Sequence, residues 1–166
     1  LYDLGVARVV VGTAAVENPS FVASLAADHE VAVGLDARGR EVAVRGWREG
    51  SGLDLLELAR KFSDLGVAAL VVTEIGRDGT LEGPDVDGLT TVLEEVDVPL
   101  VASGGVGSLE DLRTLAGIER SGRRLAGAIV GRALYEGAFG VSEAVRESTA
   151  GRAPGPVPGT AAAEST

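Results

Sequence analysis

Five short apolar runs, each followed by a polar or glycine-rich loop and then by a helical pattern, constrain this chain more than any other feature. The runs are rich in Val, Ile, Leu and Ala, and they lie at residues 8–12, 31–35, 68–73, 99–102 and 127–130. Buried strands that alternate with amphipathic helices are typical of a parallel sheet. The sequence therefore predicts an α/β fold with about five parallel strands and helices outside them.

Helical patterns fill the intervals between these runs. Asn18 followed by Pro19 has the form of a helix start, with an N-cap residue and then proline in the first turn. Between residues 53 and 65 the apolar positions fall on one face, and Gly66 is the kind of residue that ends a helix. Further helices are expected near residues 86–96, 108–116 and 141–148.

The length of the chain limits the barrel that this pattern can build. A complete eight-stranded (βα)8 barrel needs about 200 to 250 residues or more, and the chain has 166. We therefore expect residues 1–149 to form part of a TIM barrel, a half-barrel plus one strand, either as a natural half-barrel or as a piece of a longer protein. Residues 150–166 are rich in Pro, Gly, Ala and small polar residues without periodicity, which predicts a disordered tail.

Charge and composition weigh against several classes of function. The formal net charge of −10 disfavours nonspecific binding to nucleic acid, although backbone amides can still hold a phosphate. No apolar run reaches the roughly 18 residues of a membrane span, so we expect no membrane partner. The absence of cysteine excludes disulfides and thiolate metal sites, and it fits a cytoplasmic location.

Polar residues gather where the second and third runs end, and strand ends of this kind carry the chemistry of parallel barrels. Asp36 ends the second run, while Thr73 and Asp78 come at and after the end of the third. Two carboxylates over one cavity can divide acid and base work if their environments separate their pKa values. The alternative is that the aspartates only cap loops or carry solvated charge.

Glycines end the last two runs, at Gly104-Gly105 and at Gly131-Arg132. Glycine lets the backbone approach an anion closely, and each pair precedes a helical segment whose first amides can face that anion. These four residues are therefore a candidate phosphate site, and the alternative is that the glycines only make tight turns.

Weaker candidates follow the first run and lie in the loop after residue 44. Gly12 and Thr13 offer the same anion-binding chemistry, without a neighbouring partner loop. Trp47 is the only tryptophan, and its glycine-rich loop could make it a lid that stacks on a flat substrate. Arg45 beside it could pair with a phosphate or carboxylate. The alternatives are a core or isolated surface aromatic for Trp47 and a solvated charge for Arg45.

Six motifs cover most of the chain in a fixed order: RVVVGTAAVENP, VGLDARG, VRGWREGSG, VVTEIGRDGTLEGP, VASGGVGSLEDL and GAIVGRALYEG. In order and spacing they resemble the isomerase of histidine biosynthesis that acts on ProFAR, a phosphoribosylformimino aminoimidazole carboxamide ribotide. The resemblance runs from residue 1 to about residue 148. The related cyclase of the same pathway would have a different loop in place of GWREGSG and would lack IVGRALYEG, so the isomerase is favoured.

This resemblance implies a (βα)8 barrel, of which the chain would supply strands four to eight. The family converts an aminoaldose into an aminoketose, an Amadori rearrangement of a bis-phosphorylated substrate, without a metal or cofactor. By resemblance, Asp36 is the proton donor of strand five, and Thr73 and Asp78 contact the substrate and support acid chemistry. One phosphate site would be formed by Gly104, Gly105, Gly131 and Arg132, and half of the other by Gly12 and Thr13.

The resemblance leaves two alternatives to this isomerase activity. Arg45 in the RGW sequence resembles the bifunctional isomerases that also act on phosphoribosylanthranilate. The strand-one aspartate and the glycine-rich loop of strand three have no counterpart in this sequence, so a non-catalytic half-barrel that binds phosphosugars is the other alternative. An open half-barrel favours association, and we expect a homodimer or a complementing N-terminal half.

Overall fold

The computed structural model describes residues 1–149, and the tail expected at residues 150–166 lies outside the described residues. The strands are β1 (Val9–Val11), β2 (Val31–Arg38), β3 (Glu41–Val44), β4 (Glu49–Asp54), β5 (Ala69–Glu74), β6 (Leu100–Ser103), β7 (Glu119–Arg120), β8 (Arg123–Arg124) and β9 (Gly127–Ile129). After a 3-10 turn, η1 (Tyr2–Leu4), the helices are α1 (Thr13–Glu17), α2 (Pro19–Ala26), α3 (Leu55–Asp64), α4 (Val86–Glu95), α5 (Leu109–Gly117), α6 (Arg132–Tyr135) and α7 (Val141–Thr149).

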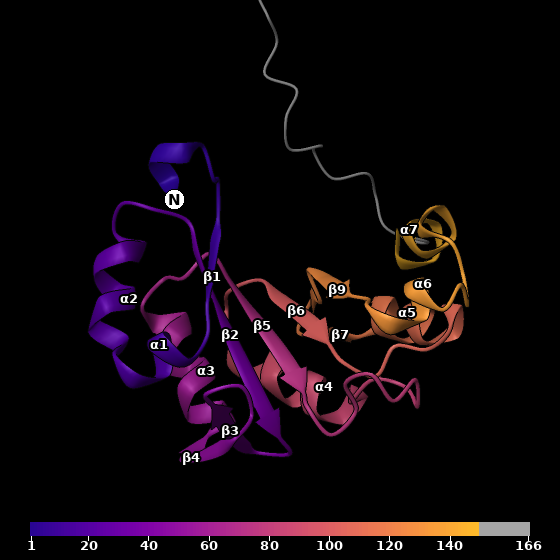
Figure 1. Cartoon of the computed structure of the whole chain (residues 1–166), viewed down its shortest axis with the longest axis horizontal. Helices are drawn as coiled ribbons and strands as arrows, with labels where there is room; N and C mark the ends of the chain where they lie inside the picture. The colour runs from indigo at the N-terminus through magenta and orange to yellow at the C-terminus, as the bar shows by residue number, and fades with distance from the viewer. Residues whose placement is uncertain (150–166) are drawn as a thin grey trace, which may run out of the picture.

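The five apolar runs form one parallel sheet, as predicted. Within the described residues its parallel strands are ordered β1, β2, β5, β6 and β9 (Figure 1). This is the arrangement of consecutive strands in a (βα) barrel, but the sheet does not close. Over residues 1–149, β1 and β9 each pair on one side only, so the partial barrel has two open edges.

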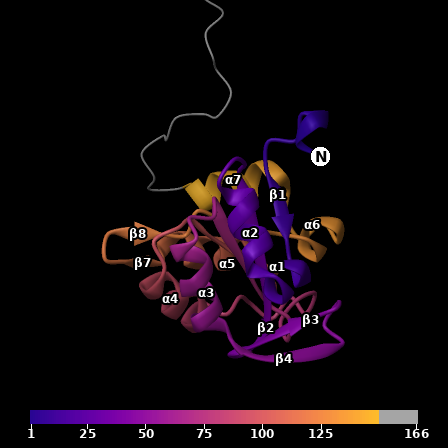
Figure 2. The ribbon, with the colours of Figure 1, turned by 90° about the vertical axis from the view of Figure 1, so that its left-hand side faces the viewer.

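One face of the sheet packs against the helices and forms the core. Leu35 of β2 and Leu70 of β5 are fully buried there, together with Phe62 of α3. Figures 1 and 2 show α3 and α4 lying behind the strands, so the helices form an outer layer on this side. Burial of such side chains contributes about 1.5–3 kcal/mol each, which makes this layer the main source of stability.

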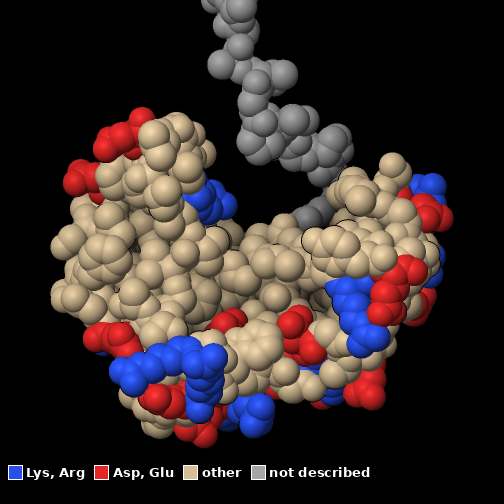
Figure 3. Space-filling model, viewed as in Figure 1, with Lys and Arg blue, Asp and Glu red and all other residues tan. Residues whose placement is uncertain are grey.

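The opposite face, called the inner face below, corresponds to the inside of a barrel. Its members alternate along the strands with the core residues, and the register places them side by side. They are Val10, Ala32, Gly34, Asp36, Ala69, Val71, Thr73, Val101, Ser103, Gly127 and Ile129. Val10 is 59% exposed and Ile129 is 50% exposed. Figure 3 looks onto this face, where charged side chains are sparse around the centre.

Local capping explains why the helices begin where they do. The Asn18 side chain accepts the N–H of Phe21 at 3.2 Å, with Pro19 in the first turn, as the sequence predicts. Asp54 caps α3 by accepting the N–H of Leu56 at 2.9 Å. Each such cap stabilises its helix by about 1 kcal/mol.

Three parts of the structure go beyond the pattern of five strands and their helices. Residues 40–44, which the sequence leaves open as a ribbon or a loop, are a ribbon, because β3 pairs antiparallel with the end of β2 and with the polar strand β4. The short helix α1 follows directly after β1. The strands β7 and β8 form a separate hairpin before β9. All three are short or polar, so their sequences carry little periodic signal.

Candidate active site

The inner face carries a row of three polar side chains at the ends of neighbouring strands. Asp36 of β2 lies in register with Thr73 of β5, and Thr73 lies in register with Ser103 of β6. Residues that pair across a parallel ladder lie on the same face of the sheet. Thr73 is only 7% exposed, whereas Asp36 and Ser103 are half-buried. The structure therefore brings together Asp36 and Thr73, and it adds Ser103, which the sequence distinguishes only as the residue before the glycine pair.

Trp47 contacts Asp36, which carries the carboxylate of this row. Its indole Nε1 donates a hydrogen bond of 2.8 Å to Oδ2 of Asp36, and 45% of the residue remains exposed. The loop reaches this position through an unusual turn, because Arg45, Gly46 and Trp47 have φ angles of 53°, 66° and 67°. Non-glycine residues adopt this region at a cost of roughly 1–2 kcal/mol each. The ring thus sits at the mouth of the row, where a lid over the substrate would have to lie.

Arg45 from the same loop is engaged by acidic neighbours. Its guanidinium donates to Glu17 at 3.2 Å and to Glu49 at 3.0 Å. The charge of Glu49 and then the hydrogen bond to Glu17 raise the pKa of Arg45 above its ordinary value. Its backbone N–H donates to Oγ1 of Thr13 at 2.9 Å. Contact between the Arg45 side chain and a substrate would require the guanidinium to leave these two carboxylates.

Asp78 lies in the loop after β5, and Glu74 holds the base of that loop. The Glu74 carboxylate accepts the N–H of Gly39 at 2.8 Å and the N–H of Gly76 at 2.9 Å. Its backbone carbonyl accepts the N–H groups of Arg77 at 3.0 Å and of Asp78 at 3.1 Å. Glu74 therefore holds the backbone at the start of the Asp78 loop and at Gly39. The exposed Asp78 carboxylate makes no hydrogen bond within residues 1–149 and is available to a ligand.

The residues predicted to form the main phosphate site line one small hollow together with Asp78. The hollow has a volume of about 20 Å³, which is close to the size that one water molecule needs. Its lining consists of Asp78, Gly79, Leu81, Gly104, Gly105, Val106, Ile129, Gly131 and Arg132. Four predicted phosphate ligands and one predicted catalytic carboxylate thus converge from three loops.

Gly104 and Gly105 are required by the packing of the neighbouring loop. Their φ angles are 93° and 83°, a region that side chains other than glycine rarely adopt. A Cβ atom on Gly104 would lie 2.9 Å from the carbonyl oxygen of Glu74, and one on Gly105 would overlap the carbonyl of Gly83. The space that these glycines leave is thus already filled by backbone of the Asp78 loop.

Gly131 and Gly12 adopt the same backbone conformation at opposite edges of the sheet. Gly131 precedes α6 with φ and ψ of −108° and −93°, and Gly12 precedes α1 with −100° and −109°. Each lies at the C-terminal end of an edge strand, β9 or β1. Asp36 and Thr73 lie on the strands between them. Two matching turns therefore flank the polar row.

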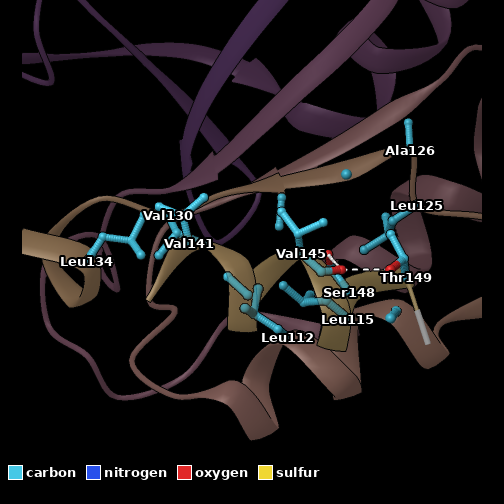
Figure 4. Close-up of a pocket in the computed structure, with 14 residues that line it drawn as sticks. Leu112, Leu115, Leu125, Ala126, Val130, Leu134, Val141, Val145, Ser148 and Thr149 are labelled. Atoms are coloured by element: carbon cyan, nitrogen blue, oxygen red, sulfur yellow. Dashed lines mark hydrogen bonds between the residues drawn. The ribbon is translucent and has the colours of Figure 1, made fainter. Parts of the chain in front are cut away.

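A cavity of about 500 Å³ lies between α5, β9 and α7 (Figure 4), and neither Asp36 nor Thr73 lines it. Its walls are apolar and include Leu112, Leu115 and Val145. The hydroxyl of Thr149 at its edge donates back to the carbonyl of Val145 at 2.7 Å. Ser148, which also lines the cavity, donates its hydroxyl to the same carbonyl at 3.1 Å.

Neither a metal cluster nor a membrane-spanning helix is found in residues 1–149. No three carboxylate or imidazole groups there lie close enough to hold a metal ion. No helix in this range is both long and apolar enough to cross a bilayer.

Comparison with known proteins agrees with this geometry. Residues 1–140 match the family model described as histidine biosynthesis protein. The chain belongs to this family. A ProFAR isomerase from Synechococcus sp. is 49% identical over 154 residues, which cover 92% of the chain and 59% of that relative. The ProFAR isomerase of Dinoroseobacter shibae is 50% identical over 143 residues, or 85% of the chain and 58% of the relative.

A further relative, from Ruegeria sp., is 48% identical over 145 residues and bears the same isomerase name. The chain spans about three fifths of the length of these curated relatives. This partial coverage agrees with a sheet that stays open over residues 1–149.

Proposed function

We propose that this chain forms the C-terminal part of a ProFAR isomerase and supplies the acid side of its active site. The observation that supports this most directly is the pair of matching turns at Gly12 and Gly131, with Asp36 and Thr73 on the strands between them. The relatives are named for a substrate that carries two phosphoribosyl groups. A ligand with a phosphate at each end matches two anion-binding turns that flank a carboxylate.

In this proposal Asp36 is the proton donor. When the ribose ring opens, the C1–O bond breaks, the nitrogen lone pair forms a C=N bond, and the ring oxygen takes a proton from Asp36. A second base then removes the proton from C2, and tautomerisation of the resulting enamine gives the aminoketose, so that atoms and electrons balance. Thr73, which neighbours Asp36 in the row, and Asp78, in the loop after β5, would bind the substrate hydroxyls and support this proton transfer.

A turnover assay with ProFAR tests the proposal. We expect Asp36→Asn to abolish turnover, because the amide cannot donate the proton, and general acid catalysis contributes about 10²–10⁴-fold. Asp28→Asn is the matched control, since Asp28 is an exposed carboxylate in the loop before β2, away from the strand ends. Phosphate binding without turnover in the wild-type chain would favour the non-catalytic half-barrel instead.

The two open edges support a partner that completes the barrel. Val10 and Ile129 expose apolar surface on the inner face, and unpaired edges with such surface favour association. We propose a homodimer or a complementing N-terminal half. Either would supply a second carboxylate, which would act as the base that removes the C2 proton. In a homodimer the two Asp36 side chains would face each other across one cavity. A monomer at micromolar concentration in sedimentation would refute the homodimer.

A second activity on phosphoribosylanthranilate is favoured by one observation. Arg45 lies on the same loop as Trp47, whose indole bonds to Asp36, so a guanidinium released from Glu17 and Glu49 would be two residues from the side chain that covers the site. Parallel assays with both substrates distinguish the bifunctional isomerase from one specific for ProFAR. A biosynthetic isomerase of this kind would work in the cytoplasm, with no need for nucleic acid, membrane or cofactor.

A further inference from the structure

The loop that carries Asp78, residues 75–84, is held by hydrogen bonds at its two ends. At its base the N–H groups of Arg77 and Asp78 donate to the carbonyl of Glu74. At its far end the N–H of Gly83 donates to the carbonyl of Gly105 at 2.9 Å. Inside the loop, the Thr80 N–H and hydroxyl donate to the carbonyl of Arg77 at 3.0 and 2.8 Å, and the Arg77 guanidinium donates to the carbonyl of Gly83 at 3.1 Å. These bonds close the loop on itself, and a contact from a neighbouring strand end would tie its centre to the rest of the sheet.

Arg132 makes that contact from the neighbouring strand end. Its Nη1 donates a hydrogen bond of 2.6 Å to the carbonyl oxygen of Gly79, 53 residues earlier in the chain. Its Nε donates to Oε1 of Glu136, the C-cap residue of α6, at 2.6 Å. The guanidinium is thus fixed between a helix carboxylate and the backbone of the residue that follows Asp78.

These two contacts explain why arginine suits this position better than lysine. A guanidinium carries its donors in a rigid plane, so Glu136 can orient one edge while the other edge binds Gly79. Lysine has one compact ammonium on a flexible stem, which could reach the Gly79 carbonyl but with less fixed geometry. The side chain is 54% exposed, so its role depends on this geometry more than on burial.

We propose that Arg132 is a positioning residue for Asp78, and that its side chain is not a phosphate ligand. The guanidinium holds the Asp78 loop against the Gly104–Gly105 turn, and the phosphate is left to backbone amides of the turns. This inference rests on the proposed function for the role of Asp78. The contact itself is a property of the chain and is tested separately.

The first test measures amide hydrogen exchange by NMR on the full chain. We expect Arg132→Ala to accelerate exchange of the Asp78, Thr80 and Gly83 amides by about tenfold, as for the loss of one hydrogen bond to a charged group. Arg132→Lys should restore part of the protection. Arg124→Ala is the control, because Arg124 forms an exposed ion pair with Glu119 on the separate hairpin. Unchanged exchange in the Ala variant would overturn the proposal.

The second test separates positioning from ligand binding. Titration with inorganic phosphate should give Arg132→Ala an affinity within about twofold of wild type, because a neutralised direct ligand would cost more. Loss of affinity in the Ala variant with recovery in the Lys variant would make Arg132 a phosphate ligand and overturn the proposal.

Kinetics give the third measurement. With ProFAR as substrate, we expect Arg132→Ala to lower kcat by about 10- to 100-fold, as for a catalytic group displaced by about 1 Å, with KM within about threefold. A raised KM with unchanged kcat would contradict the positioning role. If the wild-type chain shows no turnover, the proposed function fails, while the exchange and phosphate measurements still decide the role of Arg132.

Discussion

Replacing Gly105 by alanine tests how tightly the Asp78 loop packs on the phosphate turn. The added Cβ would overlap the carbonyl of Gly83, and it would lie 2.8 Å from the carbonyl carbon. The residue would also keep a φ of 83°, which costs a side chain about 1–2 kcal/mol. Overpacking against backbone adds about 1–3 kcal/mol. We therefore expect Gly105→Ala to lower the free energy of unfolding by about 2–5 kcal/mol.

Gly66→Ala is the matched control. Gly66 has a φ of 71° after α3, and a Cβ there would meet nothing within 4 Å. It should cost only the backbone term of about 1–2 kcal/mol. Urea unfolding of both variants and wild type, with equal m values, measures the difference. Equal losses for the two variants would show that Gly105 is needed only for its backbone conformation, and would refute the packing argument.

Three further outcomes are expected. The hydrogen bond from Arg40 lowers the pKa of Asp54 from 3.8 to about 2, so its contribution to stability is present above pH 3.8 and is lost as the pH falls through about 2. Thermal melts should show Asp54→Asn less stable than wild type at pH 6, with the gap closing by about pH 2. Because Trp47 is the only tryptophan, Asp36→Asn should shift its fluorescence emission, whereas an unshifted spectrum would argue against the Trp47–Asp36 hydrogen bond in solution. Ile129→Lys should weaken self-association in sedimentation, because it places a charge on the inner face beside an open edge.

The sequence predicts the parallel sheet because each of its strands lies in a short apolar run with a clear boundary. The order of β2, β5, β6 and β9 follows from the short connections of a (βα) barrel. The hairpin strand β4, with the sequence EGSGLD, has no periodicity and one apolar side chain, Leu53. It forms through contacts that only the folded chain provides, such as the bond of 2.6 Å from the Ser51 hydroxyl to the carbonyl of Val42.

The candidate site is predictable to the extent that it follows strand ends. Asp36, Thr73 and the glycine pairs stand directly after apolar runs, and the folded sheet brings these positions to one edge. The partners of the polar groups are not predictable in this way. The bond from Trp47 to Asp36 depends on three consecutive positive φ angles, and the bond from Arg132 to Gly79 joins residues far apart in the chain.

The two matching turns are alike in backbone but differ in what surrounds them. The Gly131 turn shares its hollow with Gly104 and Gly105, so an anion there can meet amides from two turns. Within residues 1–149, the Gly12 turn has the Arg45 loop as its neighbour, and Glu17 and Glu49 hold that guanidinium.

The carboxylates of Glu17 and Glu49 carry one negative charge more than Arg45 neutralises, and this surplus disfavours an anion at β1. The first phosphate should therefore bind beside β9. A ligand with two phosphates can occupy both turns only if Arg45 moves or if a further segment pairs with the open edge of β1 and supplies the missing amides.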